Sequence, residues 1–315
     1  MNIDIKQCVQ LLKEKDNFLI LTHAHPDGDT LGSGFALCLA LRQIGKKANV
    51  INADEFPVKY SYIYENVETL EFDCKYIVAV DVATETLLGR LQKDFSGKIN
   101  LCIDHHATNT NYAENILLDS DSASCCEIVF DVIKELGATV TKTVADCLYT
   151  GISTDTGCFR FANTTANTFS VAAELVKYGA DNAMINRKMF ETKTKTYAHL
   201  ERLALEGMKF YYDGKVAIIT VTQQMYKITG SSEIETEALT PLTRQVEGTE
   251  IGIMLKEKED GTCKASIRTY ESVDASKLAS CFGGGGHKAA AACKIDADVE
   301  NATKMLLKQC GEFIE

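Results

Sequence analysis

The densest group of chemically reactive side chains lies in residues 22–34, THAHPDGDTLGSG. Within seven positions the chain places two histidines and two aspartates, His23, His25, Asp27 and Asp29. An apolar run precedes this stretch and a helix-like run follows it. Where a strand meets a helix in an open α/β sheet, side chains gather at the carboxyl ends of the strands, which is where ligands bind. We therefore expect chemistry at this edge, with His25 as a bystander.

Three further segments carry the same residue types to predicted strand or helix ends. They are YIVAVD, NLCIDHH and TGISTD, and they contribute Asp81, Asp104, His105, His106 and Asp155. A single aspartate after a strand is most often a turn or cap residue. Four such segments on one sheet edge point instead to a cation, because close carboxylates disfavour each other's ionisation. We expect Asp104 to act as a partner of a histidine rather than as a direct ligand.

The donor types indicate which metal would bind. Oxygen and imidazole ligands without thiolate favour Mn²⁺, Mg²⁺ or Co²⁺ over a structural zinc. The donors are too many for a single ion that must also hold water and substrate. Two ions about 3.5–4 Å apart, joined by a bridging carboxylate, suit the hydrolysis of a phosphoester.

Length and composition define the class of protein. A chain of 315 residues suits two domains, and 45% hydrophobic residues suit a sizeable core. No apolar run has the length of a membrane span, and the N-terminus lacks a signal-peptide pattern, so we expect a cytoplasmic protein without membrane partners. The twelve cysteines are scattered, as expected for reduced, buried residues. The net charge of −11, without a basic run, argues against tight binding of long nucleic acid.

The first part of the chain alternates strand and helix patterns. Strands are expected at 18–22, 47–52, 76–81 and 99–104, and helices at 4–15, 31–45, 123–136, 141–152 and 166–178. This alternation predicts an α/β domain with a largely parallel sheet, over residues 1–185. Residues 186–208 have few strong apolar positions and are expected to form a linker helix.

A different pattern begins at residue 209. Two hairpins are predicted, with turns at Asp213-Gly214 and Asp260-Gly261. A glycine run at 283–286 and a last helix near 298–313 follow. Residues 209–315 are therefore expected to form a smaller α+β domain.

These motifs resemble a known family. HAHPDGDTLGS, DVAT, DHH and STDTG resemble the four motifs of the DHH phosphoesterases, and GGGGH resembles the DHHA1 substrate-binding domain found with them. The order and length are most similar to the oligoribonuclease/pAp-phosphatase (nanoRNase) branch. The resemblance covers nearly the whole chain and makes a homodimer an expectation.

The resemblance implies a role for each candidate residue. One ion would be held by His23, Asp27 and Asp81, and a second by Asp29, Asp81, His105 and Asp155. Asp81 would bridge the two ions, and His106 would be free to contact the scissile phosphate. Sequence does not choose between Asp155, Asp29 and His106 as the group that assists proton transfer.

The second domain holds the predicted substrate contacts. Glycines let backbone N–H groups approach a phosphate closely, although a glycine run is more commonly a turn. The resemblance implies that Arg268, the glycines including Gly284, Gly285 and Gly286, and His287 grip the phosphate or base of a short nucleotide. Arg160 and Thr164 could lie near the cleft, but a plain surface role is about as consistent with their sequence.

We therefore expect a Mn²⁺-dependent phosphohydrolase that acts by a water activated between two ions. Its expected substrates are short RNA oligomers, linear dinucleotides such as pApA, and 3′-phosphoadenosine 5′-phosphate. A cyclic-di-AMP phosphodiesterase shares both domains and remains an alternative. A related inorganic pyrophosphatase would carry a Ser-Arg-Lys-Lys cluster, which is not found here. A non-catalytic nucleotide sensor is disfavoured because every ligand position is filled.

Overall fold

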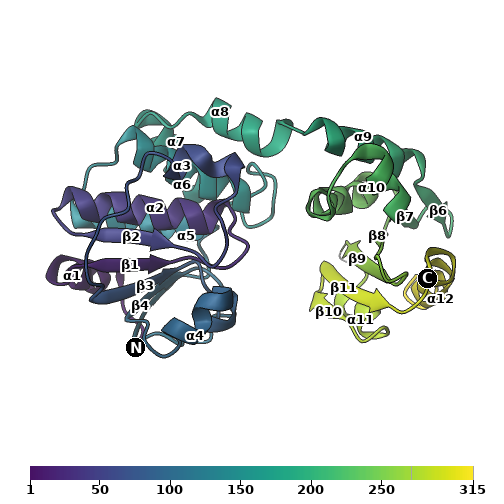
Figure 1. The fold of residues 1–315 in the computed structure, drawn as a ribbon, viewed down its shortest axis with the longest axis horizontal. Helices are drawn as coiled ribbons and strands as arrows, with labels where there is room; N and C mark the ends of the chain where they lie inside the picture. Colours follow the sequence, from purple (N-terminus) through teal and green to yellow (C-terminus); the bar gives the residue numbers. More distant parts are fainter. Residues whose placement is uncertain (271, 315) are drawn as a thin grey trace. The chain divides into compact units, whose positions relative to one another are not determined.

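The computed structural model describes residues 1–270 and 272–314 and divides into two compact units, Met1–Thr192 and Lys193–Glu315 (Figure 1). The first unit contains a parallel sheet flanked by helices, and the second contains a mixed sheet. This agrees with the α/β fold and the smaller α+β domain that the sequence predicts.

The sheet of the first unit has five strands in the order β2-β1-β3-β4-β5, all parallel. The bounds are β1 Phe18–Leu21, β2 Ala48–Ile51, β3 Tyr76–Val80, β4 Leu101–Asp104 and β5 Asn115–Leu118. Four of these strands agree with the predicted ones, and β5 was not predicted. From β1 the chain winds one way to β2 and the other way to β3, β4 and β5. The switch point between β1 and β3 is where an open sheet leaves a crevice for ligands.

The long helices of the first unit cover one face of this sheet. They are α1 Ile5–Glu14, α2 Gly28–Gln43, α5 Cys125–Leu136, α6 Lys142–Asp155 and α7 Ala166–Lys177. Figure 1 shows α2 and α6 above the strands, and apolar side chains of α2, α5 and α6 share one core with β1, β3 and β4. A second cluster, which includes Leu21, Ala79, Leu88 and Cys102, covers the opposite face. The short segments η1 Val58–Tyr60, α3 Ser61–Tyr64, η2 Glu85–Leu91 and α4 Gln92–Phe95 complete the unit.

Two helices reach further toward the candidate site than the sequence predicts. The helix expected at 31–45 already begins at Gly28, because the side chain of Asp27 caps it by accepting from the N–H groups of Asp29 and Thr30. The helix expected to end at residue 152 continues to Asp155. In both cases a site residue belongs to a helix terminus rather than to a loop.

The segment expected as one linker helix, 186–208, is divided in the structure. Helix α8, Asn182–Asn186, continues into a single π-helical turn, η3 Arg187–Glu191, and α9 then begins at Lys195 and ends at Glu206. Thr194 caps α9 through its side chain. Although α9 has few apolar residues, its Leu200 is fully buried in a cluster with Ile219 and Met254 of the second sheet.

The second sheet has six strands in the order β10-β11-β9-β8-β7-β6. The bounds are β6 Lys209–Tyr211, β7 Val216–Val221, β8 Ile251–Glu257, β9 Cys263–Thr269, β10 Gly285–His287 and β11 Ala290–Ile295. Both predicted hairpins are present, as β6–β7 and β8–β9. Strands β7 and β8 are parallel, so the chain crosses between them through α10 Gln223–Thr229 and η4 Glu233–Gln245, which the sequence did not predict.

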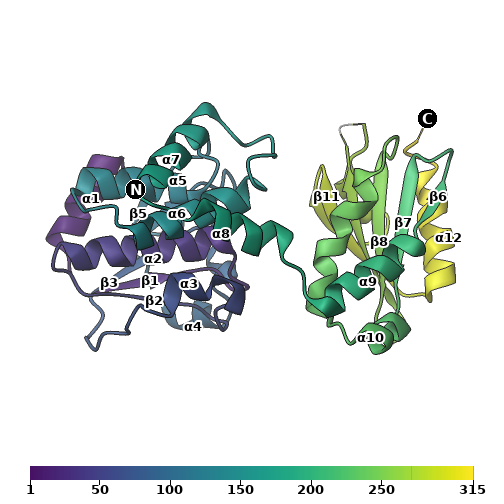
Figure 2. The ribbon, with the colours of Figure 1, turned by 90° about the horizontal axis from the view of Figure 1, so that it is seen from above.

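Helices cover both faces of the second sheet (Figure 2). Helices α11 Ala275–Ser280 and α12 Val299–Cys310 pack on one face with Ile251, Ile253 and Ile267, and α9 lies on the other. Among the described residues, no helix combines the length and apolar character that a membrane span needs.

We predict that Leu200→Ala lowers the free energy of unfolding of the second unit by about 2–5 kcal/mol, because it removes a fully buried side chain. Leu205→Ala on the same helix, where the side chain is exposed, should change it by less than about 0.5 kcal/mol. Guanidinium unfolding followed by circular dichroism measures both. Equal effects of the two variants would mean that α9 does not contribute to this core.

Candidate metal centre

The predicted site residues from the first unit meet at the switch point of the parallel sheet. His23 follows β1, Asp81 follows β3, and His105 follows β4. The other two elements are helices whose ends reach the same edge, α2 with Asp27 at its N-terminus and α6 with Asp155 at its C-terminus. Five elements from four separate segments of the sequence therefore converge.

The first donor group contains His23, Asp27 and Asp81. The Nε2 atom of His23 lies 3.5 Å from Asp27 Oδ1 and 3.5 Å from Asp81 Oδ2. Asp27 is half exposed, with 51% of its side chain accessible, whereas Asp81 is buried. This group has the composition predicted for the first ion.

The second donor group centres on the Nε2 atom of His105. It lies 3.4 Å from Asp155 Oδ2, 3.6 Å from Asp81 Oδ1 and 3.8 Å from Asp29 Oδ2. Potential ligand atoms of Asp29, His105 and Asp155 lie close enough together to hold one ion. The structure thus brings together the residues predicted for the second ion, and their role as ligands stays a prediction.

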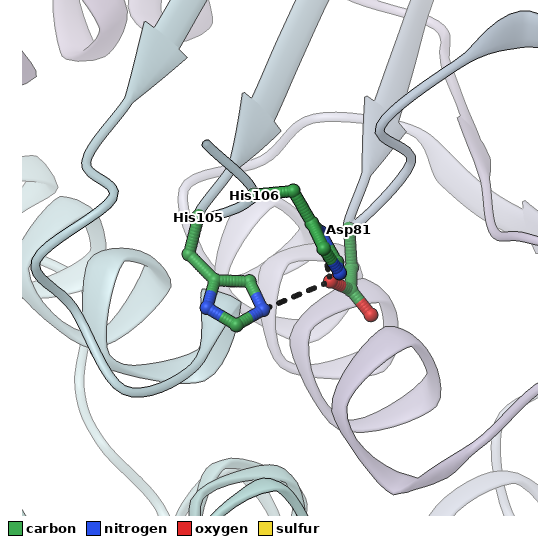
Figure 3. A group of neighbouring side chains, drawn as sticks. All are labelled: Asp81, His105 and His106. Carbon is green, nitrogen blue, oxygen red and sulfur yellow. Dashed lines mark ion pairs between the residues drawn. The ribbon is translucent and has the colours of Figure 1, made fainter. Parts of the chain in front are cut away.

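Asp81 connects the two groups. Figure 3 shows its carboxylate facing His105 and His106, which follow the neighbouring strand. Its backbone has a φ of 57°, the left-handed region that a residue other than glycine rarely adopts. Its Oδ1 atom and the Nε2 atom of His105 are both buried without a hydrogen-bond partner among the described residues. A cation bound between these two atoms, which lie 3.6 Å apart, would give both of them a partner.

Backbone carbonyls fix which nitrogen each histidine presents. His23 Nδ1 lies 2.9 Å from the carbonyl of Ala24, and His105 Nδ1 lies 3.2 Å from that of Ser122. A carbonyl only accepts, so Nδ1 is the donor and Nε2 of the neutral ring keeps its lone pair for a metal.

His106 has a separate partner, as the sequence predicts. Its Nδ1 atom lies 2.8 Å from Asp104 Oδ1, and Asn109 donates to Asp104 Oδ2 at 2.6 Å. Asp104 is fully buried, whereas 41% of the His106 side chain is exposed. Burial works to raise the pKa of Asp104, but the bonds from His106 and Asn109 lower it overall. Asp104 therefore orients His106 from behind.

Burial and mutual repulsion dominate the acid–base properties of the carboxylates. They raise the pKa of Asp29 to about 6, that of Asp155 to about 8, and that of Asp81 well above its ordinary value. For His23, burial works to lower the pKa, but the hydrogen bonds and charges of Asp27 and Asp81 outweigh it and raise the pKa to about 11. The carboxyl groups therefore resist ionising together, and divalent ions would supply the positive charge that stabilises them as anions.

A pocket of about 140 Å³ opens over these groups. Its lining residues are His23, Asp27, Asp81, Leu87, His106 and Asp155. Two histidines and three carboxylates therefore border one space in which a phosphate and water could meet them.

Sheet packing explains two of the four glycines in the run of the second unit. A side chain at Gly284 would collide with the carbonyl of Ala292, and one at Gly286 would lie 2.5 Å from the Cα of Ala291. Gly286 also has a φ of 150°. Gly283 and Gly285 have open space at their Cβ positions, so close approach to a ligand is reasonable at these two glycines.

Arg268 and His287 share one row of the second sheet. Ala290 of β11 pairs with Arg268 of β9 on one side and with His287 of β10 on the other. Directly paired residues point to the same face of a sheet. The two predicted substrate contacts therefore point to one face, while their binding role stays a prediction.

Arg160 and His25 make contacts of their own. Arg160 is exposed, donates to the carbonyl of Gly157 at 2.6 Å, and lies over the ring of Phe190 at 5.8 Å. The His25 ring is 96% exposed and lies 3.3 Å from Asp54 Oδ2, as expected for a bystander. Neither residue lines the pocket over the carboxylates.

Sequence reasoning missed the residues that support the site. Asn109, five positions after Asp104, has a side chain that could have been suspected. Ser122, Cys125 and Cys126 act through backbone groups, for which residue type gives no signal.

Comparison with known proteins now defines the class. Residues 17–152 match the DHH family, N-terminal domain, and residues 214–315 match the DHHA1 domain. The chain belongs to the DHH family, and its second unit contains a DHHA1 domain.

Individual relatives extend this similarity over nearly the whole chain. The chain is 33% identical over 299 residues to the bifunctional oligoribonuclease and PAP phosphatase NrnA of Thermus thermophilus, covering 93% of this chain and 89% of that protein. It is 24% identical to the NrnA of Bacillus subtilis, covering 92% of each. The crystal structure of an exopolyphosphatase-related protein from Bacteroides fragilis has a TM-score of 0.89 at 23% identity, covering 98% of this chain and 96% of that one, and shares the fold.

Without divalent ions, we predict that stability falls as the pH rises from about 4 to about 8. Asp29 and Asp155 have folded pKa values of about 6 and about 8, above their ordinary value of 3.8, so the folded state binds more protons across this window. His23 adds stability that is complete below pH 6.5 and is lost toward pH 11, in the same direction.

Thermal unfolding in EDTA at several pH values measures this dependence. Asp155→Asn should make the unfolding temperature depend less on pH. Addition of Mn²⁺ should also reduce this pH dependence. A midpoint that stays constant or rises between about pH 5 and pH 8 in EDTA would contradict the prediction.

Proposed function

We propose that this protein is a divalent-metal-dependent phosphoesterase that hydrolyses short oligoribonucleotides and linear dinucleotides such as pApA to mononucleotides. We propose 3′-phosphoadenosine 5′-phosphate as a further substrate and Mn²⁺ as the preferred ion. Membership of the DHH family and the names of the two NrnA relatives support this choice of substrate.

One observation carries the proposal, the position of Asp81 between two donor sets. Its Oδ2 atom lies 3.5 Å from His23 Nε2, and its Oδ1 atom lies 3.6 Å from His105 Nε2. A buried acceptor without a donor is costly, and a carboxylate shared by two cations removes that cost. We therefore assign His23, Asp27 and Asp81 to one ion, and Asp29, Asp81, His105 and Asp155 to the other.

Bound divalent ions would supply the charge that lowers the pKa of a water and neutralises the phosphoryl oxygens. The chain's own groups bind and orient the substrate. The hydrogen bond that His106 donates to Asp104 raises the pKa of His106 above its ordinary value, so the partly exposed ring is suited to donate to an anionic oxygen. Asp155, 25% exposed at the pocket, is proposed both as ligand and as proton carrier.

The second unit is proposed to hold the end of a short nucleotide. Arg268 offers a planar fork for a phosphate, and His287 lies in the same row. The open space beside Gly285 leaves room for close contact with its backbone. A net charge of −11 disfavours a long polyanion, which supports a preference for short substrates.

A panel of substrates with Mn²⁺ tests the proposal. We expect pApA and a short RNA to yield mononucleotides, and a long RNA to turn over far more slowly. Asp81→Ala should lower kcat/KM by roughly a thousandfold or more, because it removes several kcal/mol of charge stabilisation. Chromatography of the products, with and without EDTA, provides the measurement.

Other results would change the assignment. Faster cleavage of cyclic-di-AMP than of linear forms would identify a cyclic dinucleotide phosphodiesterase. Nucleotide binding without turnover of any substrate would indicate a sensor. Equal rates on long and short RNA would overturn the proposed preference for short substrates.

Arg268→Ala is predicted to raise KM for pApA by roughly 10- to 100-fold with a smaller change in kcat. A hydrogen bond to a charged group contributes about 1.5–3 kcal/mol, and each 1.4 kcal/mol is about tenfold. Arg202→Ala, which removes an exposed arginine from α9, is the matched control. Steady-state kinetics on both variants measure this effect. An unchanged KM for Arg268→Ala would show that Arg268 does not bind the substrate.

A further inference from the structure

Asp29 is held from behind by the first turn of helix α5. The N–H of Cys125 donates to Asp29 Oδ2 at 2.7 Å, and the N–H of Cys126 donates to Asp29 Oδ1 at 3.0 Å. Both carboxylate oxygens are thus tied to adjacent amides of one helix. Because Asp29 is fully buried, water cannot replace these bonds.

The start of α5 is well suited to hold an anion. The first amides of a helix have no acceptor within the helix, and the aligned peptide dipoles give this end a partial positive charge. Ser124 caps α5 by accepting from the N–H of Glu127, which leaves the amides of Cys125 and Cys126 for Asp29. The ligand of these amides is therefore a side chain of the protein itself.

Helix α6 packs against the side of Asp29 that α5 does not contact. A methyl group on Gly151 would lie 2.5 Å from Asp29 Oδ1 and would collide with the sulfur of Cys126. Glycine at position 151 is therefore required for the close approach of α6 to Asp29. The carboxylate is confined on two sides and can turn little.

The remaining direction leads to the candidate metal centre. Asp29 Oδ2, which accepts from Cys125, also lies 3.8 Å from His105 Nε2, and that nitrogen lies 3.4 Å from Asp155 Oδ2. Cys125 is thus connected to the second donor group through a single carboxylate.

We propose that the amide of Cys125, with the rest of the first turn of α5 and Gly151, positions Asp29 as a ligand of the second ion. The inference rests on the proposed function and adds positioning residues to it. These residues touch neither substrate nor metal. A purely structural role of the same bonds would affect stability without affecting metal affinity, which makes the two roles separable.

Cys125→Pro replaces the N–H that donates to Asp29 Oδ2 with a ring carbon, which cannot donate and which displaces the carboxylate oxygen 2.7 Å from that nitrogen. Position 125 is the first residue of α5, where proline is favoured because its missing N–H has no partner in the helix. Ser124 has the extended backbone, with a ψ of 157°, that a residue before proline adopts. Cys125→Ala is the matched control, since it also loses the thiol but keeps the N–H.

The readout is Mn²⁺ binding to the full chain, measured by calorimetry without substrate. Loss of an outer contact to a metal ligand typically weakens metal affinity about 10- to 100-fold, and we expect this at one ion for Cys125→Pro. Cys125→Ala should bind within about threefold of the wild type. Equal affinity of the proline and alanine variants would overturn the inference, as would a wild type that binds no Mn²⁺.

Gly151→Ala keeps the test decisive if Cys125→Pro does not fold. Its methyl group displaces Asp29 while all amides remain, so the same loss of affinity at one ion is expected, and wild-type affinity would overturn the inference. Failure of the proposed function is recognised separately. A wild type that binds two ions but hydrolyses no substrate of the panel would refute the activity, while the comparison of the variants would still decide the role of α5.

Discussion

The burial of several carboxylates beside one another is the constraint on which the rest of the first unit depends. Asp29 and Asp81 are buried almost completely, and Asp155 and Asp27 lie beside them. Burial together with like charge raises the pKa of three of the four, so the folded chain alone does not fully stabilise them as anions. Burying these carboxyl groups together therefore destabilises the folded state unless a cation binds between them.

The surrounding elements reduce this repulsion without removing it. Asp27 caps α2, and Asp29 accepts from the first two amides of α5, so two helix N-termini point partial positive charge toward the group. The parallel sheet brings the strand ends together at its switch point, as its winding requires. Asp81, which lies between the two donor groups, has a left-handed backbone conformation, a type of strain that clusters at functional sites.

Much of this arrangement could be predicted from the sequence. Runs such as Phe18–Leu21 are apolar and end abruptly in charged residues, so four strands and the side chains after them were found. The start of α2 at Gly28 was not predicted, because glycine and aspartate have low helix propensity. Capping by Asp27 explains why the helix begins there. Strand β5 is a four-residue run without alternation. Other parts of the site are backbone features, which residue type does not reveal. They are the amides that donate to Asp29, the carbonyl that accepts from His105 and the φ of Asp81.

The glycines show that a residue pattern can arise from packing that the sequence does not reveal. The run at 283–286 indicated a loop that approaches a phosphate, yet Gly284 and Gly286 are needed because β11 leaves no room for side chains. Gly151, which drew no attention in the sequence, touches the candidate metal centre through Asp29. Absence of a side chain therefore marks close packing in both places. The predicted nucleotide contacts of the second unit that this packing does not account for are Arg268 and His287, which share one row of the sheet.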